Sequence, residues 1–143
     1  MKTIGSWAIT LAVIAGISWW INPSIFAYLG MVENDDERII DAWRDKTSNI
    51  FVEVEGRVVR LRPDLDYYTR FQHFLIELEN GHRLMVKHDL DISQIVPVVA
   101  NSMIRLKGEY DWSETGGVIH WTHRDITNTR EGGWIDSNGI RYN

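Results

Sequence analysis

The sequence contains no cysteine among its 143 residues. This absence excludes disulfide bonds, thiolate metal sites and a cysteine nucleophile. A small domain without such crosslinks must be stabilised by packing, and the seven tryptophans supply large apolar surfaces for it.

Charge is missing from the first part of the chain. No charged residue lies between Ile4 and Leu29, and Lys2 is the only basic residue before Glu33. At about 1.5 Å per residue, a helix over residues 4–21 would span roughly 27 Å, close to the thickness of a bilayer core. The cationic end stays in the cytoplasm. We therefore expect one transmembrane helix within residues 1–30, membrane contact through residues 4–29, a bacterial inner-membrane location, and a C-terminal domain facing the periplasm.

A cleaved signal peptide that ends near Ala27 is the alternative interpretation of this segment. The apolar stretch is long for a signal peptide, and no clean pair of small residues marks a cleavage site before the acidic residues. Both interpretations place the following domain in the same compartment.

Basic residues are outnumbered in the rest of the chain. The net charge is −5, and all twenty acidic residues lie at or after Glu33. An acidic domain is poorly suited to hold nucleic acid through general charge. Only a local basic stripe would allow such binding.

Residues 31–49 are expected to form a short amphipathic linker helix. Asp35 or Asp36 can cap a helix that runs to about Lys46. Ile39, Ile40 and Trp43 make one apolar face. The helix is expected to connect membrane and domain, and its alternative role is to dock on another membrane protein.

The pattern then changes to the alternation typical of strands. Asn80-Gly81 is a strong signal for a two-residue hairpin, and Gly56 predicts a bulge or sharp bend within a long first strand. The predicted strands are Ile50–Leu61, Arg70–Leu78, His82–Lys87, Ser102–Trp112 and Val118–His123, with a small terminal hairpin over residues 134–142.

Residues 89–99 are predicted to form a short helix or a helical turn, because several apolar residues precede Pro97 at compatible spacings. Five strands with a helix between the third and fourth is the order of an OB-type barrel. The sequence therefore predicts a mainly β protein, with a small five-stranded OB-like barrel over residues 50–143 that follows the transmembrane helix and the linker.

The densest polar cluster lies near the end of the fifth predicted strand. His120, His123 and Asp125 fall within six residues, and His88 ends the third strand. They are candidate catalytic residues, and the three histidines are candidate metal ligands. In a continuous strand the odd spacing of His120 and His123 would put them on opposite faces, so they can share a ligand only if the strand ends near Thr122. The alternative is that these histidines are hydrogen-bonded structural groups, and no cofactor is then expected.

Aromatic and arginine side chains are the candidate ligand-binding groups. Aromatic rings can stack on bases or sugars, although in a small barrel they also pack in the core. The candidates are Arg70, Tyr110, Trp112, Trp121, Arg124 and Trp134.

Two runs carry a resemblance to a known family: Gly108-Glu109-Tyr110-Asp111-Trp112, and Gly116 to Asp125 followed by Gly132-Gly133-Trp134. With them, residues 50–142 resemble the bacterial domain-of-unknown-function family 3465. The resemblance implies a small exported protein and no assigned activity.

Three positions depart from the pattern of that family. Phe71 stands where a histidine is usual, Arg124-Asp125-Ile126 replaces a His-Asp-Pro run, and Arg130 takes another usual histidine position. If those histidines are ligands or bases in relatives, this chain lacks them, which argues against catalysis.

Three functions follow as hypotheses. The first is a non-catalytic binding module of the cell envelope, with an oligosaccharide, nucleic-acid or protein ligand. The second is a metal-assisted hydrolase, acting on phosphodiesters, that uses His120, His123 and Asp125. The third is a structural or assembly partner of another membrane protein. The sequence does not fix the oligomeric state.

Overall fold

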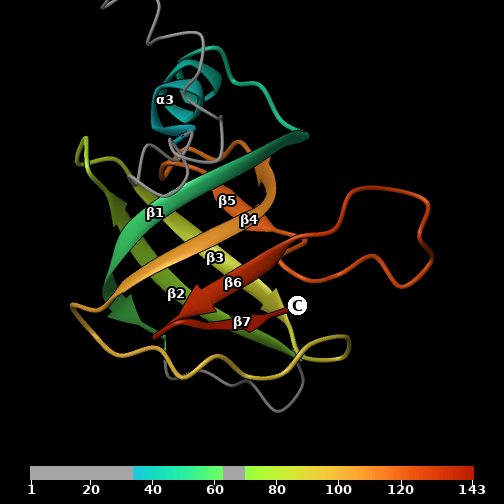
Figure 1. The fold of residues 1–143 in the computed structure, drawn as a ribbon. Coiled ribbons are helices and arrows are strands. Elements are labelled where there is room, and N and C mark those ends of the chain that lie inside the picture. Colours follow the sequence, from blue (N-terminus) through green and yellow to red (C-terminus); the bar gives the residue numbers. More distant parts are fainter. Residues whose placement is uncertain (1–33, 63–69) are drawn as a thin grey trace, which may run out of the picture. The chain divides into compact units, whose positions relative to one another are not determined.

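The computed structural model describes residues 34–62 and 70–143 (Figure 1). The expected membrane segment, residues 4–29, and the alternative cleavage point near Ala27 lie outside the described residues. Within the described ranges, no helix combines the length and the apolar character needed to cross a bilayer.

In this part of the chain, seven strands follow one helix. They are α3 (Asp36–Arg44), β1 (Ile50–Leu61), β2 (Phe71–Leu78), β3 (Arg83–Asp89), β4 (Met103–Asp111), β5 (Val118–His120), β6 (Trp134–Ser137) and β7 (Ile140–Tyr142). The prediction of a mainly β chain is confirmed, and the predicted strand bounds agree with the structure to within a few residues.

The strands close into a five-stranded barrel. β1 pairs with β4 through Ile50–Arg57 and with β2 through Gly56–Leu61. The first half of this long strand is therefore bonded to one neighbour and the second half to the other. The remaining pairings join β2 to β3 and β4 to β5 in antiparallel fashion, and β3 to β5 in parallel. β6 and β7 extend the sheet from β4 as a hairpin. The predicted barrel and its terminal hairpin are therefore confirmed.

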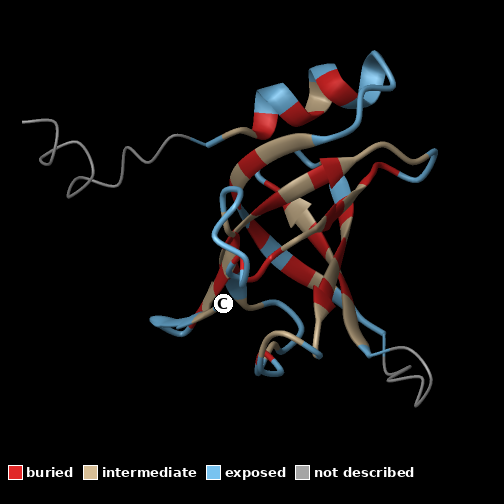
Figure 2. Ribbon diagram, turned by 90° about the vertical axis from the view of Figure 1, so that its right-hand side faces the viewer, coloured by how far each residue is buried: buried red, intermediate tan, exposed pale blue. Residues whose placement is uncertain are grey.

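The core follows from the alternation of the strands. Val52, Val54, Phe74, Leu84 and Leu106 are buried, whereas their neighbours in sequence are more exposed. Figure 2 shows this alternation along the barrel strands. Tyr110 is the largest side chain that is fully buried in the core.

Two details of the prediction need correction. The predicted bulge is not at Gly56, which pairs regularly with both β2 and β4, and the irregularity of β1 lies between Val58 and Arg60. Residues 89–99 do not form a helix: one helical turn, closed by Ser93 N donating to Asp89 O at 3.1 Å, is followed by irregular backbone. The side chain of Gln72 explains this, because its amide donates to Val96 O (2.8 Å) and accepts from Val96 N (2.9 Å). Those backbone groups are therefore not used by a helix.

The helix α3 lies at one end of the barrel in Figure 1, and the segment between β3 and β4 lies at the other. Ile39 and Ala42 belong to the core cluster, and Trp43 Nε1 donates to Ser113 O at 3.0 Å. Asp35 does not cap the helix through its side chain but accepts a hydrogen bond from Glu53 N at 2.8 Å. The apolar face of the helix therefore packs on the barrel of its own chain.

Candidate functional site

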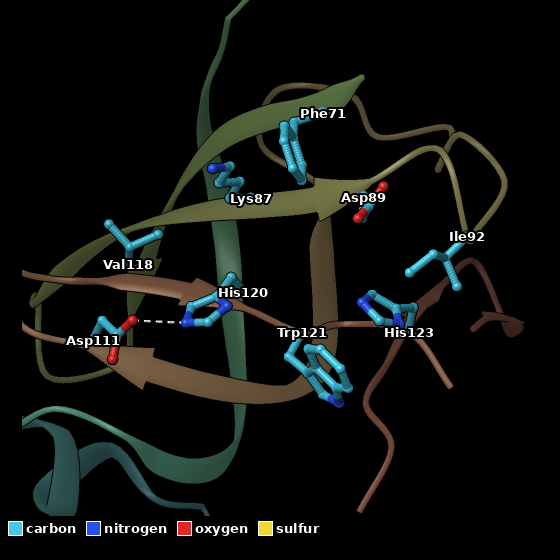
Figure 3. Close-up of a pocket in the computed structure, with 9 residues that line it drawn as sticks. All are labelled: Phe71, Lys87, Asp89, Ile92, Asp111, Val118, His120, Trp121 and His123. Carbon is cyan, nitrogen blue, oxygen red and sulfur yellow. Dashed lines mark hydrogen bonds and ion pairs between the residues drawn. The ribbon is translucent and has the colours of Figure 1, made fainter. Parts of the chain in front are cut away.

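A pocket of about 480 Å³ opens on the outer face of the barrel where β3 and β5 meet. Its wall combines apolar, cationic and anionic groups (Figure 3). The lining residues are Phe71, Lys87, Asp89, Ile92, Asp111, Val118, His120, Trp121 and His123. This volume falls within the range of roughly 300–1,000 Å³ found for small-molecule sites.

Strand alternation places most of this wall. On β3, Leu84, Val86 and His88 are buried, so Lys87 and Asp89 face outward. On β5, Ile119 is buried, and His120 therefore faces outward beside them. Because Phe71 is paired with Asp89 across the sheet, β2 adds an aromatic ring to the same face.

The end of β5 brings two histidines to one pocket. The strand ends at His120, and Trp121 adopts a left-handed backbone conformation with φ 55°. For a bulky residue this conformation is rare and strained. The turn breaks the alternation, so His120 and His123 both line the pocket. A shared ligand for His120 and His123 was expected only if the strand ended near Thr122, and β5 ends at His120.

His123 presents one ring nitrogen to the pocket. Its Nδ1 lies 2.8 Å from Arg124 O, and because a carbonyl only accepts, Nδ1 carries a proton. The residue is 3 % exposed. Within residues 34–62 and 70–143, its Nε2 has no hydrogen-bond partner. Figure 3 shows the ring facing the space enclosed by Asp89, Ile92 and Trp121.

His88 lies on the inner side of the sheet, behind the pocket. Its Nε2 donates to Gln94 O (3.1 Å), and its Nδ1 lies 2.8 Å from the hydroxyl of Thr122. Burial lowers the pKa of His88 below its usual value. The ring is therefore a neutral hydrogen-bonding group of the interior, and the structure does not bring it to His120.

Asp125 organises the loop between β5 and β6. Its carboxylate accepts hydrogen bonds from the backbone N–H groups of Thr127, Thr129 and Arg130 and from the Thr127 hydroxyl. These bonds, led by that from Arg130 N–H, hold the pKa of Asp125 far below its usual value. It does not line the pocket, and a carboxylate so stabilised is a poor base.

The candidate ligand-binding residues are dispersed over the domain, and only Trp121 lines the pocket. Tyr110 is buried in the core, and Trp112 Nε1 donates to Trp43 O beside α3. Trp134 lies on β6, and the guanidinium carbon of Arg141 lies 3.8 Å from the centroid of its ring.

The two arginine candidates lie outside the pocket as well. Arg70 forms an ion pair with Asp91, and Arg124 is exposed on the loop after β5.

A comparison with protein families matches residues 23–143 to a family described as a protein of unknown function (DUF3465). The chain belongs to this family. A search of the curated proteins found no match. The family assignment covers α3, the whole barrel and the terminal hairpin, and it brings no activity with it.

Sequence reasoning missed most of the wall that this DUF3465 domain builds. Lys87 and Asp89 carry no local signal of function, whereas Phe71 and Asp111 were noted only through the family resemblance and not as site residues. A usable signal was the expected strand order, since pairing of the third and fifth strands puts Lys87 and Asp89 next to His120.

One group among the described residues has the composition and spacing of a metal site. It contains Glu109, Asp111 and His120, whose nearest ligand atoms all lie within 4.8 Å of one another. It shares His120 with the histidine set expected from the sequence, but not His88 or His123.

Proposed function

We propose that the protein is a non-catalytic binding module of the bacterial cell envelope, in which an OB-like barrel binds a sugar unit of an oligosaccharide in the β3–β5 pocket. The pocket carries the proposal, because it combines apolar walls with several convergent polar groups in one concave site. The strand order, with β3 parallel to β5 and β1 shared between two pairings, supports the comparison with OB barrels, which bind oligonucleotides or oligosaccharides on one face.

The charges in the pocket favour a sugar over a nucleic acid. Asp89 and Asp111 would repel phosphates, whereas carboxylates accept hydrogen bonds from sugar hydroxyls. Lys87 can donate, and the free Nε2 of His123 can accept when the ring is neutral. A polyhydroxylated ligand therefore matches the polar groups of the wall.

The aromatic rings also argue against base stacking. The ammonium of Lys87 lies 4.1 Å from the ring centroid of Phe71, and the guanidinium of Arg130 lies 4.4 Å from that of Trp121. One face of each ring is therefore already covered by a cation. These rings serve better as apolar walls than as an open platform for successive bases.

The hydrolase hypothesis is less well supported by the same geometry. It requires Asp125 beside His120 and His123, but the Asp125 carboxylate is held by the N–H groups of its own loop. The assembly hypothesis required a free apolar face on α3. Ile39 on that face is 0 % exposed, and Trp43, which is 39 % exposed, is tied to the barrel through its bond to Ser113 O.

Binding of envelope sugars is expected to depend on Asp89. In the full chain in detergent, soluble peptidoglycan or lipopolysaccharide-core oligosaccharides should shift the Trp121 indole resonance saturably. Asp89→Asn should weaken this binding about tenfold, since a charged acceptor is stronger than a neutral one by roughly 1–1.5 kcal/mol. The amide oxygen that this substitution introduces can still accept from Asp91 N, as Asp89 Oδ1 does at 2.8 Å.

The matched control is Asp45→Asn, at an exposed position just after α3. It should leave the affinity unchanged. Saturable binding of a single-stranded oligonucleotide but of no sugar would contradict the proposed ligand class, and equal affinity of the two variants would contradict the site.

The membrane location is the second part of the proposal, and the uncharged segment 4–29 supports it. We expect the full chain to stay with the membrane pellet after alkaline carbonate extraction and to be degraded when protease is added to spheroplasts. Matched chains without residues 1–30 should be released and protected from the protease. Release of the full chain, or its protection in spheroplasts, would contradict an anchored domain facing the periplasm.

A further inference from the structure

Two carboxylates and an imidazole converge where β4 meets β5. Glu109 is paired with His120 across these strands, and Asp111 ends β4 on the same face. His120 Nε2 lies 2.7 Å from Asp111 Oδ2 and 3.7 Å from Glu109 Oε1. Figure 3 shows the contact between Asp111 and His120 at the edge of the pocket.

Each carboxylate is fixed by one oxygen and presents the other to His120. Glu109 Oε2 is held by the guanidinium of Arg130, and Asp111 Oδ1 accepts from Asn49 N at 3.1 Å. This leaves Glu109 Oε1 and Asp111 Oδ2 on the side of His120. Supporting hydrogen bonds of this kind orient the ligands of protein metal sites.

The local charge also favours a cation. The two carboxylates carry two negative charges, and within the described ranges Arg130 is the one arginine or lysine in ion-pair contact with them. The imidazole is the third ligand group, and a mixed set of nitrogen and oxygen donors suits Zn²⁺ and its neighbours better than Mg²⁺ or Ca²⁺.

The adjoining space offers a further polar atom without a protein partner. His123 is 3 % exposed, lines the same pocket as Asp111 and His120, and has no Nε2 partner within residues 34–62 and 70–143. This nitrogen is not among the buried side-chain atoms that lack a partner, so it is open to the pocket and can pair with water or with a group bound there.

We infer that Glu109, Asp111 and His120 form a binding site for one divalent transition-metal ion of the zinc class. Donors at about 2.0–2.2 Å from zinc lie roughly 3–3.6 Å from each other in tetrahedral geometry. The separations of His120 Nε2 from Asp111 Oδ2 (2.7 Å) and from Glu109 Oε1 (3.7 Å) need only small side-chain movements to reach these values. Three protein ligands leave a coordination position for water or for a group bound in the pocket. The inference does not depend on the sugar proposed above.

The test uses the full chain, purified in detergent without a histidine tag, and metal ions alone. Isothermal titration with Zn²⁺ should give one ion per chain. The variants Asp111→Asn and His120→Asn should each weaken binding by roughly 100-fold or more, since a direct ligand is worth more than its supporting partners. His73→Asn, which alters a histidine of β2 outside the group, should bind as the wild type does.

A measurement on the wild type keeps the inference falsifiable if a variant fails to fold. Paramagnetic Co²⁺ at one equivalent should broaden the imidazole resonances of His120 and leave those of His82 sharp, since His82 bonds to Gly116 O outside the group. The absence of saturable Zn²⁺ binding, equal affinity in all four proteins, or uniform broadening of the histidines would overturn the metal site. Sugar binding that persists without metal would leave the proposed function standing.

Discussion

Replacing Gly133 with alanine is expected to lower the free energy of unfolding by on the order of 3–5 kcal/mol, the range of severe packing errors. A methyl group at this position would lie within 3.0 Å of the carbonyl oxygens of both Trp121 and Lys107. Neither is a flexible side chain, because one belongs to the strained turn after β5 and the other to β4. The backbone must therefore move, and with it the pocket wall that the turn carries.

Urea unfolding of the full chain in detergent measures this effect, and the same samples report whether the Trp121 resonance is displaced. Gly139→Ala is the matched control. Gly139 has φ 78°, but nothing lies within 4 Å of an added methyl group, so only the backbone penalty of about 1–2 kcal/mol is expected. Equal unfolding midpoints for the two variants would show that the close approach at Gly133 is not what positions the turn.

Replacing His88 with leucine is expected to cost roughly 1–3 kcal/mol of unfolding free energy, because the change leaves the buried Thr122 hydroxyl and the part-buried Gln94 carbonyl oxygen without their partner. The side chain is 0 % exposed and bonds to both Gln94 O and the Thr122 hydroxyl. Leucine fills comparable space but cannot bond to either, and an orphaned buried group costs about 1–3 kcal/mol. The loss should also loosen Thr122, which follows Trp121 in the pocket wall.

The pH dependence of unfolding separates the role of His88 from simple packing. Burial lowers the pKa of the folded-state imidazole, so the unfolded chain takes up a proton at a higher pH than the folded chain. Stability should therefore be complete above about pH 6.5, the ordinary histidine value, and should decrease as the pH falls below it. Burial also lowers the pKa of His73, so His88→Leu should make this decrease shallower without abolishing it. An unchanged slope in the variant would contradict a buried neutral His88.

The strands were predictable because their physical cause is local. Alternation of Val52 and Val54 with charged neighbours marked β1, and Asn80-Gly81 marked the β2–β3 hairpin, where the structure has Gly81 at φ 83°. Of the helix or helical turn predicted over residues 89–99, only the turn that ends at Ser93 is present. The backbone of Val96 beyond it is held by a side chain that is distant in sequence, that of Gln72. No pattern within the segment reveals that contact.

The site was predictable only in part, for the same reason. The region around His120 was a candidate because of its dense polar residues. The convergence of His120 with His123 depends on the left-handed conformation of Trp121, which a tryptophan does not signal. The contribution of Glu109 and Asp111 depends on the register of β4 against β5, which only the closed barrel establishes.

The barrel is joined between β3 and β5 by only two residue pairs, Met85 with Val118 and Val86 with Ile119. Lys87 and Asp89 on one side of this junction and His120 on the other form opposite walls of the pocket. Any molecule in the pocket that contacts both walls bridges the shortest junction of the sheet. Binding in the pocket and closure of the barrel between β3 and β5 are therefore thermodynamically linked. Backbone amides along β3 and β5 should then exchange with deuterium more slowly when the pocket is filled, and local opening of this junction would release the occupant before the rest of the domain unfolds.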